Sequence, residues 1–168
     1  MPYANGGFAT ASGKAEFASD AMESLGQPRV PTWEPLLEGP GSEAMERFPL
    51  MLATPKKQPR FLNTSYSGLD GHAGREKGPF IELDAADAEA RGLADGDLAS
   101  AFNDRGRITL TVQISDRLRP GLASIAWGWV SGAYGGVPAN GLTNDDSTDL
   151  GGGAAYGDTL VQVEPAPA

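Results

Sequence analysis

The chain has 168 residues and a formal net charge of −9, from 13 lysines and arginines against 22 aspartates and glutamates. This acidic balance argues against non-specific binding to nucleic acid or to an anionic membrane surface. The absence of cysteine excludes disulfides, cysteine-ligated zinc and cysteine-ligated iron–sulfur clusters within the chain. No run approaches the ~20 apolar residues of a membrane span, and the many glycines and prolines favour a loop-rich β protein.

The first 47 residues show weak periodicity and are expected to form an irregular lead-in arm. The segment DAMESLG predicts a helical turn that is ended by Gly26, and the proline-rich stretch 27–43 is typical of an extended tether. Because a free-standing domain rarely begins with so long an irregular segment, we expect the arm to come from a neighbouring domain. The predicted barrel domain is then 48–164, and 165–168 is a tail.

The run FPLMLAT, residues 48–54, predicts a first strand that is buried on both faces. It ends at Pro55, and residues 55–69 hold three basic side chains and no acidic one. In so acidic a chain this reversal predicts an anion site, with a solvated basic loop as the alternative. The candidate ligands are the cations Lys56, Lys57 and Arg60 and the neutral side chains Asn63, Thr64 and Ser65.

Residues 80–115 predict a strand, a short helix, a strand and a long strand, separated by tight turns. Asp84 can cap the helix by accepting an amide hydrogen bond, and Gly92 suits its end. Asp95-Gly96 and the segment 103–106 carry turn residues. Apolar residues alternate with threonine and glutamine over 108–115, which predicts a strand with one buried face.

The last third of the chain predicts a turn at 119–121, a strand towards Trp127, a long loop and a closing strand over 159–164. Trp127 and Trp129 would share a face if the strand persists, either as core or as a flat platform for a ring-shaped ligand. Residues 135–158 are rich in glycine, asparagine and aspartate, and long loops in compact domains commonly bind something. The lone His72 is expected to be an ordinary loop residue.

Five motifs follow one another over nearly the whole chain: SGKAEF, LATPKKQPRFLNTSYS, IELDAADAEARGLADGDLASAFNDRGR, LRPGLASIAWGW and NGLTNDDSTDLGGGAAYGDTLVQVE. In this order they resemble the C-terminal dinucleotide-binding domain of the molybdopterin oxidoreductases. The resemblance implies a mainly β fold, namely a six-stranded double-psi β-barrel of the aspartate decarboxylase type. One or two short helices and long loops would complete it.

The resemblance also implies a cofactor, molybdopterin guanine dinucleotide, whose molybdenum or tungsten is held by the full-length enzyme. It implies no catalytic residue and no metal ligand in this chain. The basic loop would meet the diphosphate and the amide-rich loop would meet the fused polar rings. The implied cofactor-binding residues are Thr54, Pro55, Lys56, Arg60, Asn63, Ser65, Gly128, Trp129, Asn140, Leu142 and Thr143.

By the same resemblance the chain is a cofactor-clamping fragment of an oxidoreductase, without redox turnover alone. Its expected partners are the remaining domains of the parent enzyme, with no nucleic acid and no membrane insertion, and the isolated domain is expected to be monomeric and cytoplasmic. Three alternatives stay open: an adaptor module, a self-cleaving decarboxylase-like enzyme, and an extracellular ligand-binding domain. Self-cleavage would need a Gly-Ser turn in the barrel, but Gly41-Ser42 lies in the tether.

Overall fold

The computed structural model describes residues 2–56, 78–129, 132, 135–148 and 150–167. Contacts divide the chain into two units, Met1–Pro35 and Leu36–Ala168. In the first unit, helix α1 (Asp20–Ser24) begins after Ser19, whose hydroxyl accepts a hydrogen bond from the Met22 amide at 3.4 Å. Gly26 follows the helix with a φ of +78°, which confirms the predicted helical turn. None of the described residues 2–35 is buried.

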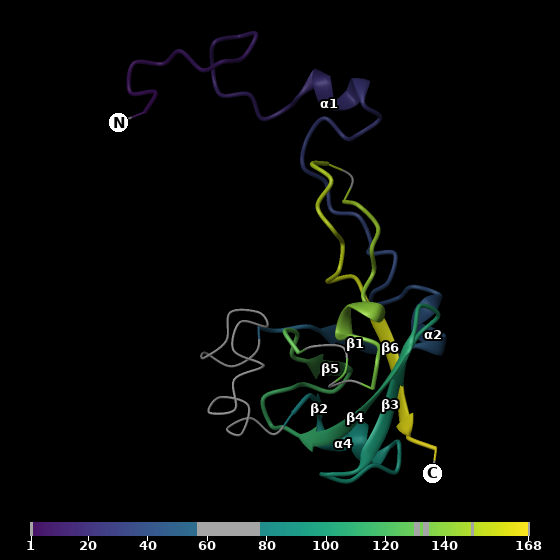
Figure 1. Ribbon diagram of the computed structural model, residues 1–168. Helices are drawn as coiled ribbons and strands as arrows, with labels where there is room; N and C mark the ends of the chain where they lie inside the picture. The colour runs from purple at the N-terminus through teal and green to yellow at the C-terminus, as the bar shows by residue number, and fades with distance from the viewer. Residues whose placement is uncertain (1, 57–77, 130–131, 133–134, 149, 168) are drawn as a thin grey trace. The chain divides into compact units, whose positions relative to one another are not determined.

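The second unit is built on a closed barrel of six strands, whose order is β1-β5-β2-β4-β3-β6 (Figure 1). The pairs β1–β5 and β2–β4 are parallel, and the other four pairs are antiparallel. The predicted mainly β fold with six strands and a few short helices is therefore confirmed. The strands are β1 (Leu50–Ala53), β2 (Phe80–Leu83), β3 (Leu98–Phe102), β4 (Arg107–Ile114), β5 (Leu122–Ile125) and β6 (Leu160–Pro165).

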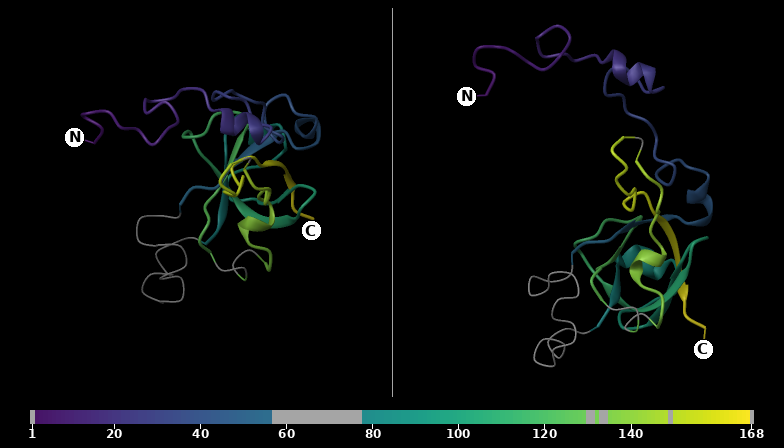
Figure 2. Two further views of the ribbon diagram at one scale, coloured as in Figure 1. Left: turned by 90° about the horizontal axis from the view of Figure 1, so that it is seen from above. Right: turned by 45° about the horizontal axis from the view of Figure 1, so that its top comes forward.

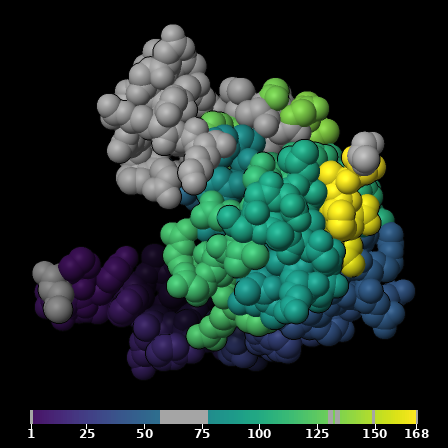
Figure 3. Space-filling view, turned by 90° about the horizontal axis from the view of Figure 1, so that it is seen from below, coloured from purple at the N-terminus to yellow at the C-terminus, as the bar shows by residue number. Residues whose placement is uncertain are grey.

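The segment from β2 to β4 follows its local sequence signals. The Asp84 carboxylate accepts a hydrogen bond from the Ala86 amide at 2.8 Å and so caps helix α4 (Ala85–Glu89). Gly92 and Gly96 take φ values of +66° and +88°, which L side chains rarely adopt, so both predicted turns form where glycine permits them. In the space-filling view the segment from β2 to β4, coloured teal, makes up much of one face of the barrel, beside β6 in yellow (Figure 3).

The barrel core comes from alternate strand residues, and this corrects one prediction. In β1 Leu50 and Leu52 are buried, whereas Met51 is half-buried and Ala53 is exposed. The expectation that the first strand is buried on both faces is therefore wrong. In a closed barrel only the inward face of each strand meets the core, and the apolar residues on the outer face of β1 stay partly accessible.

Residues 36–47 belong to the same compact unit as the barrel. Helix α2 (Ala44–Arg47) precedes β1, and the Arg47 guanidinium pairs with the Asp104 carboxylate at 2.8 Å in the β3–β4 turn. The contacts thus group these residues with the barrel, while the domain limits 1–47, 48–164 and 165–168 stay predictions. Within the described ranges, no helix has the length and apolar character needed to cross a membrane.

Candidate functional site

A pocket of about 480 Å³ opens at one end of the barrel. Residues from three separate parts of the barrel unit form its walls: the end of β1, the segment after β5, and the long loop between β5 and β6. The lining residues are Thr54, Trp127, Asn140, Thr143, Asn144, Asp145, Ala154 and Tyr156. We call this cavity the rim pocket.

The parallel pairing of β1 with β5 brings the first two walls together. Because the strands run in the same direction, the segments that follow them leave the barrel at the same end. The pairing continues past both strands as an isolated bridge between Lys56 and Trp127, in which the Trp127 amide donates to the Pro55 carbonyl at 3.1 Å. The chain leaving β1 therefore lies directly beside Trp127.

The third wall is held by buried anchors. The 3₁₀ turn η2 (Ala139–Gly141) and the residue after it bury Ala139 and Leu142 in the core, at 1% and 0% exposure. Between these anchors Asn140 is left exposed, and Thr143 is half-buried, with its hydroxyl donating to the Asn140 carbonyl at 3.1 Å. The turn thereby presents an amide and a hydroxyl to the rim pocket.

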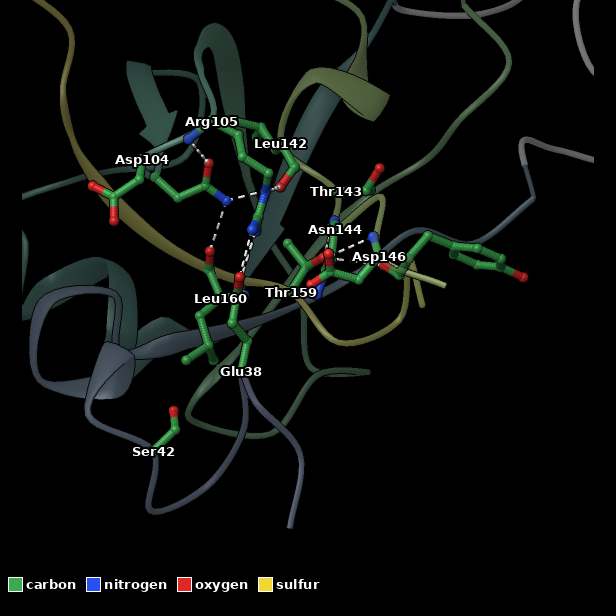
Figure 4. Close-up of polar contacts among 12 residues, drawn as sticks. Glu38, Ser42, Asp104, Arg105, Leu142, Thr143, Asn144, Asp146, Thr159 and Leu160 are labelled. Carbon is green, nitrogen blue, oxygen red and sulfur yellow. Dashed lines mark hydrogen bonds and ion pairs between the residues drawn. The ribbon is translucent and has the colours of Figure 1, made fainter. Parts of the chain in front are cut away.

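Asn144 extends this wall from a buried position (Figure 4). Its amide N–H donates to the Thr159 hydroxyl at 3.0 Å, and its side-chain oxygen accepts from the Asp146 amide at 2.9 Å. The Thr159 hydroxyl in turn donates to the Tyr156 carbonyl at 3.1 Å. The start of the long loop is therefore tied to its end, directly before β6.

The middle of the long loop folds back on itself as a hairpin that projects from the barrel (Figures 1 and 2). Ser147 and Ala154 pair as an antiparallel bridge, and the Thr148 amide donates to the Gly153 carbonyl at 2.7 Å. Ala154 and Tyr156, on its returning side, line the rim pocket, and Tyr156 is exposed. The hairpin thus adds an aromatic residue to the lining of the rim pocket.

The structure brings together part of the predicted site. Thr54, Asn140 and Thr143 line the rim pocket, and Pro55 and Lys56 lie beside it through the bridge to Trp127. Three other predicted residues do not line it: Leu142 is wholly buried, Trp129 packs on the core, and Gly128 is half-buried next to it. The predicted residues Arg60, Asn63 and Ser65, together with Lys57, Thr64 and His72, lie outside the described residues.

Several lining residues were missing from the predicted set. The sequence left open whether Trp127 is a core residue or a platform for a ligand. Strand β5 ends at Ile125, so Trp127 lies beyond the strand, where it lines the pocket and need not share a face with Trp129. Asn144 and Asp145 directly follow the motif at 140–143 and could have been added by extending that motif. No local signal distinguishes Ala154 or Tyr156, because only the hairpin brings them to the pocket.

Comparison with known proteins assigns the chain to a family. The sequence model described as the molydopterin dinucleotide binding domain matches residues 50–160. This chain is a member of the molybdopterin dinucleotide-binding domain family. The match contains strands β1 to β5 and the first residue of β6, together with every described residue of the rim pocket. The resemblance found in the sequence and the role as a cofactor-binding domain are thereby confirmed.

Relatives of this dinucleotide-binding domain are much longer proteins. It is 32% identical over 163 residues to a probable oxidoreductase, YoaE, of Bacillus subtilis, covering 97% of this chain and 23% of that protein. It is 37% identical over 127 residues to the dimethyl sulfoxide/trimethylamine N-oxide reductase of Cereibacter sphaeroides, covering 71% of this chain and 15% of the reductase. The chain thus spans less than a quarter of the length of either relative.

The fold itself recurs in a solved structure. Acetylene hydratase from Pelobacter acetylenicus superposes with a TM-score of 0.84 at 21% identity, over 99% of this chain and 25% of the hydratase chain. At this identity the likeness concerns the fold alone. The dinucleotide-binding domain described here therefore has the fold of a segment that makes up a quarter of the longer hydratase chain.

Proposed function

We propose that the rim pocket binds molybdopterin guanine dinucleotide, and that the chain acts as the cofactor-binding domain of a larger molybdenum or tungsten oxidoreductase. The observation that supports this most is the convergence of the segment after β1 with the loop 139–145 around one cavity. The remaining domains of such an enzyme would be its partners, and a cytoplasmic location stays a prediction.

The donor set suits the polar rings of this cofactor. Asn140 and Asn144 offer amide groups, Thr54 and Thr143 offer hydroxyls, and fused polar heterocycles need such short directional partners. Asp145 is exposed and adds a carboxylate that can accept from ring N–H and amino groups. The set is complementary to a pterin or a guanine.

Size and charge complete the fit. Ligand pockets measure about 300–1,000 Å³, so a cavity of about 480 Å³ holds one part of a dinucleotide and leaves the rest on the open face. Lys56 lies exposed beside the pocket and would pair with the diphosphate, while Trp127 offers a ring face for stacking. When bound, the cofactor and its metal supply the redox chemistry, and these residues hold and orient it.

The experiment is an NMR titration of the 168-residue chain with guanosine diphosphate, and with guanosine as the uncharged comparison. We expect millimolar binding, because most cofactor contacts are absent from the diphosphate, with shifts confined to Thr54–Lys56, Trp127 and Asn140–Asp145. Lys56→Gln should weaken diphosphate binding and leave guanosine binding unchanged, whereas Lys14→Gln, in the other unit, should alter neither. Shifts confined to other parts of the barrel, or none at millimolar ligand, would refute the proposal.

A further inference from the structure

We propose that Arg105 and Asn103 are positioning residues for the rim pocket, although neither lines it. They lie in the β3–β4 turn and fix the segment Ala139–Asn144 through the backbone carbonyl of Leu142, and Glu38 holds Arg105 in place. The inference rests on the proposed function only for its consequence, namely that ligand affinity at the rim pocket depends on this turn.

The contacts converge on one carbonyl oxygen (Figure 4). The Arg105 Nε–H donates to the Leu142 carbonyl at 2.9 Å, and the Asn103 side-chain amide donates to the same oxygen at 2.8 Å. The Asn103 amide also donates to the Leu160 carbonyl at 3.0 Å, at the start of β6. Leu142 is thereby fixed on two sides, by its buried side chain and by its backbone.

Glu38 fixes the direction in which Arg105 points its Nε–H towards this carbonyl. Both Nη groups donate to the Glu38 carboxylate, one of them at 2.8 Å, and Glu38 also accepts the Leu160 amide at 3.1 Å. The guanidinium is planar, so binding its Nη side to a carboxylate aims Nε along a fixed direction. A lysine has a single nitrogen and cannot hold both directions at this spacing.

The charge state of the pair is secured by its surroundings. The hydrogen bond from Arg105 lowers the pKa of Glu38 and outweighs the burial that would raise it, and the Leu160 amide lowers it further. The pKa of Arg105 is raised, first by the hydrogen bond to Glu38. Two other carboxylates, Asp104 and Asp145, face this pair through longer-range interactions, and both favour the charged guanidinium.

The same turn supports the segment sterically. A Cβ placed on Gly106 would lie 2.8 Å from the Gly141 carbonyl oxygen, so the two backbones are already in close contact. Residues 103–106 therefore contact η2 at Gly141 and donate hydrogen bonds to the carbonyl of the next residue, Leu142. Asn140 and Thr143, which flank these two positions, gain their place at the rim pocket from this contact.

The test compares Arg105→Met with Arg47→Met in the ligand-free chain. Arg47 donates two hydrogen bonds to the carboxylate of Asp104, which precedes Arg105 in the turn, and none to the Leu142 carbonyl. It is therefore the matched control. We expect Arg105→Met to shift the Thr143 and Asn144 amide resonances and to speed amide exchange at Asn144 about tenfold, as loss of one charged hydrogen bond implies. The amide of Val112, in β4, serves as the reference for global unfolding. Its exchange should change only as much as the variant changes the free energy of global unfolding.

Conservative variants separate positioning from general support. Arg105→Lys should leave exchange at Asn144 fast. Glu38→Gln keeps one acceptor oxygen but removes the charge and the second acceptor, and it should give a smaller increase in the same direction. If Arg105→Met is poorly folded, Glu38→Gln alone decides. Unchanged exchange and unchanged shifts at Thr143 and Asn144 in these variants would overturn the proposal.

The ligand arm is read separately. If the wild-type chain binds guanosine diphosphate, Arg105→Met should weaken binding several-fold and Arg47→Met should not. Equal affinity of the wild type and Arg105→Met would overturn the link between the turn and the pocket. If the wild type binds no diphosphate, the proposed function fails, and the exchange rates still decide whether the turn positions the segment.

Discussion

The β3–β4 turn contributes one residue to each of two acid–arginine pairs, and these pairs should differ sharply in strength. Glu38–Arg105 has side-chain exposures of 19% and 27%, whereas Arg47–Asp104 has exposures of 64% and 65%. Exposed pairs couple by about 0.2–1 kcal/mol, and breaking a buried pair costs about 3–5 kcal/mol. We therefore expect a coupling energy of about 2 kcal/mol for Glu38 with Arg105 and a clearly smaller one for the exposed pair of Arg47 with Asp104.

The assay is a double-mutant cycle for each pair, with alanine at either position and at both, followed by urea unfolding at pH 7. Repeating the measurement at high salt should remove most of the Arg47–Asp104 coupling and leave much of the Glu38–Arg105 coupling, because burial limits screening. Equal coupling energies for the two pairs would show that partial burial does not strengthen the Glu38–Arg105 pair and would refute the reasoning.

Three further predictions concern stability, each measured by urea unfolding. Arg105 lowers the folded-state pKa of Glu38. The difference in the free energy of unfolding between wild type and Glu38→Gln should therefore be largest above the unfolded pKa of about 4.3, and it should disappear as the pH falls through the lower, folded-state pKa. Leu142→Ala should lower the free energy of unfolding by about 2–5 kcal/mol, against under about 0.5 kcal/mol for the exposed Leu150→Ala. Gly106→Ala should cost about 1–3 kcal/mol because its Cβ meets the Gly141 carbonyl, whereas Gly157→Ala, in open space, should be neutral; equal effects would contradict the close contact.

Local signals predicted the segment from β2 to β4 well. The Asp84 cap, the turn at Asp95-Gly96 and the alternation in β4 as far as Gln113 appear as expected, since each depends on residues within a few positions of one another. The alternation fails at the end of the strand, where Ile114 is exposed. The predicted turn at 103–106 also forms, with the backbone N–H of Asn103 donating to the Gly106 carbonyl at 3.0 Å. Such features are stabilised within their own segment, so their sequences suffice.

The rest depended on pairing between distant segments. That Lys56 pairs with Trp127 follows only from the parallel β1–β5 register, which no local pattern encodes. Asn103 and Arg105 were seen only as turn residues, because their partners lie 39 and 37 positions further along the chain. Glu38 was assigned to a tether, and its bond to Arg105 spans 67 positions. The rim pocket could thus be proposed from motifs, but its supporting residues could not.

The pairing of β6 also constrains how the barrel can form during synthesis. This last strand lies between β1 and β3 and joins them into a closed cylinder. A nascent chain that ends at Asp158 would therefore hold five strands with unpaired edges on β1 and β3, and exposed edges invite pairing with other chains. Closure must wait until the ribosome has released residues 160–165, so cotranslational folding of this unit should be late and slow, as expected for long-range β pairing.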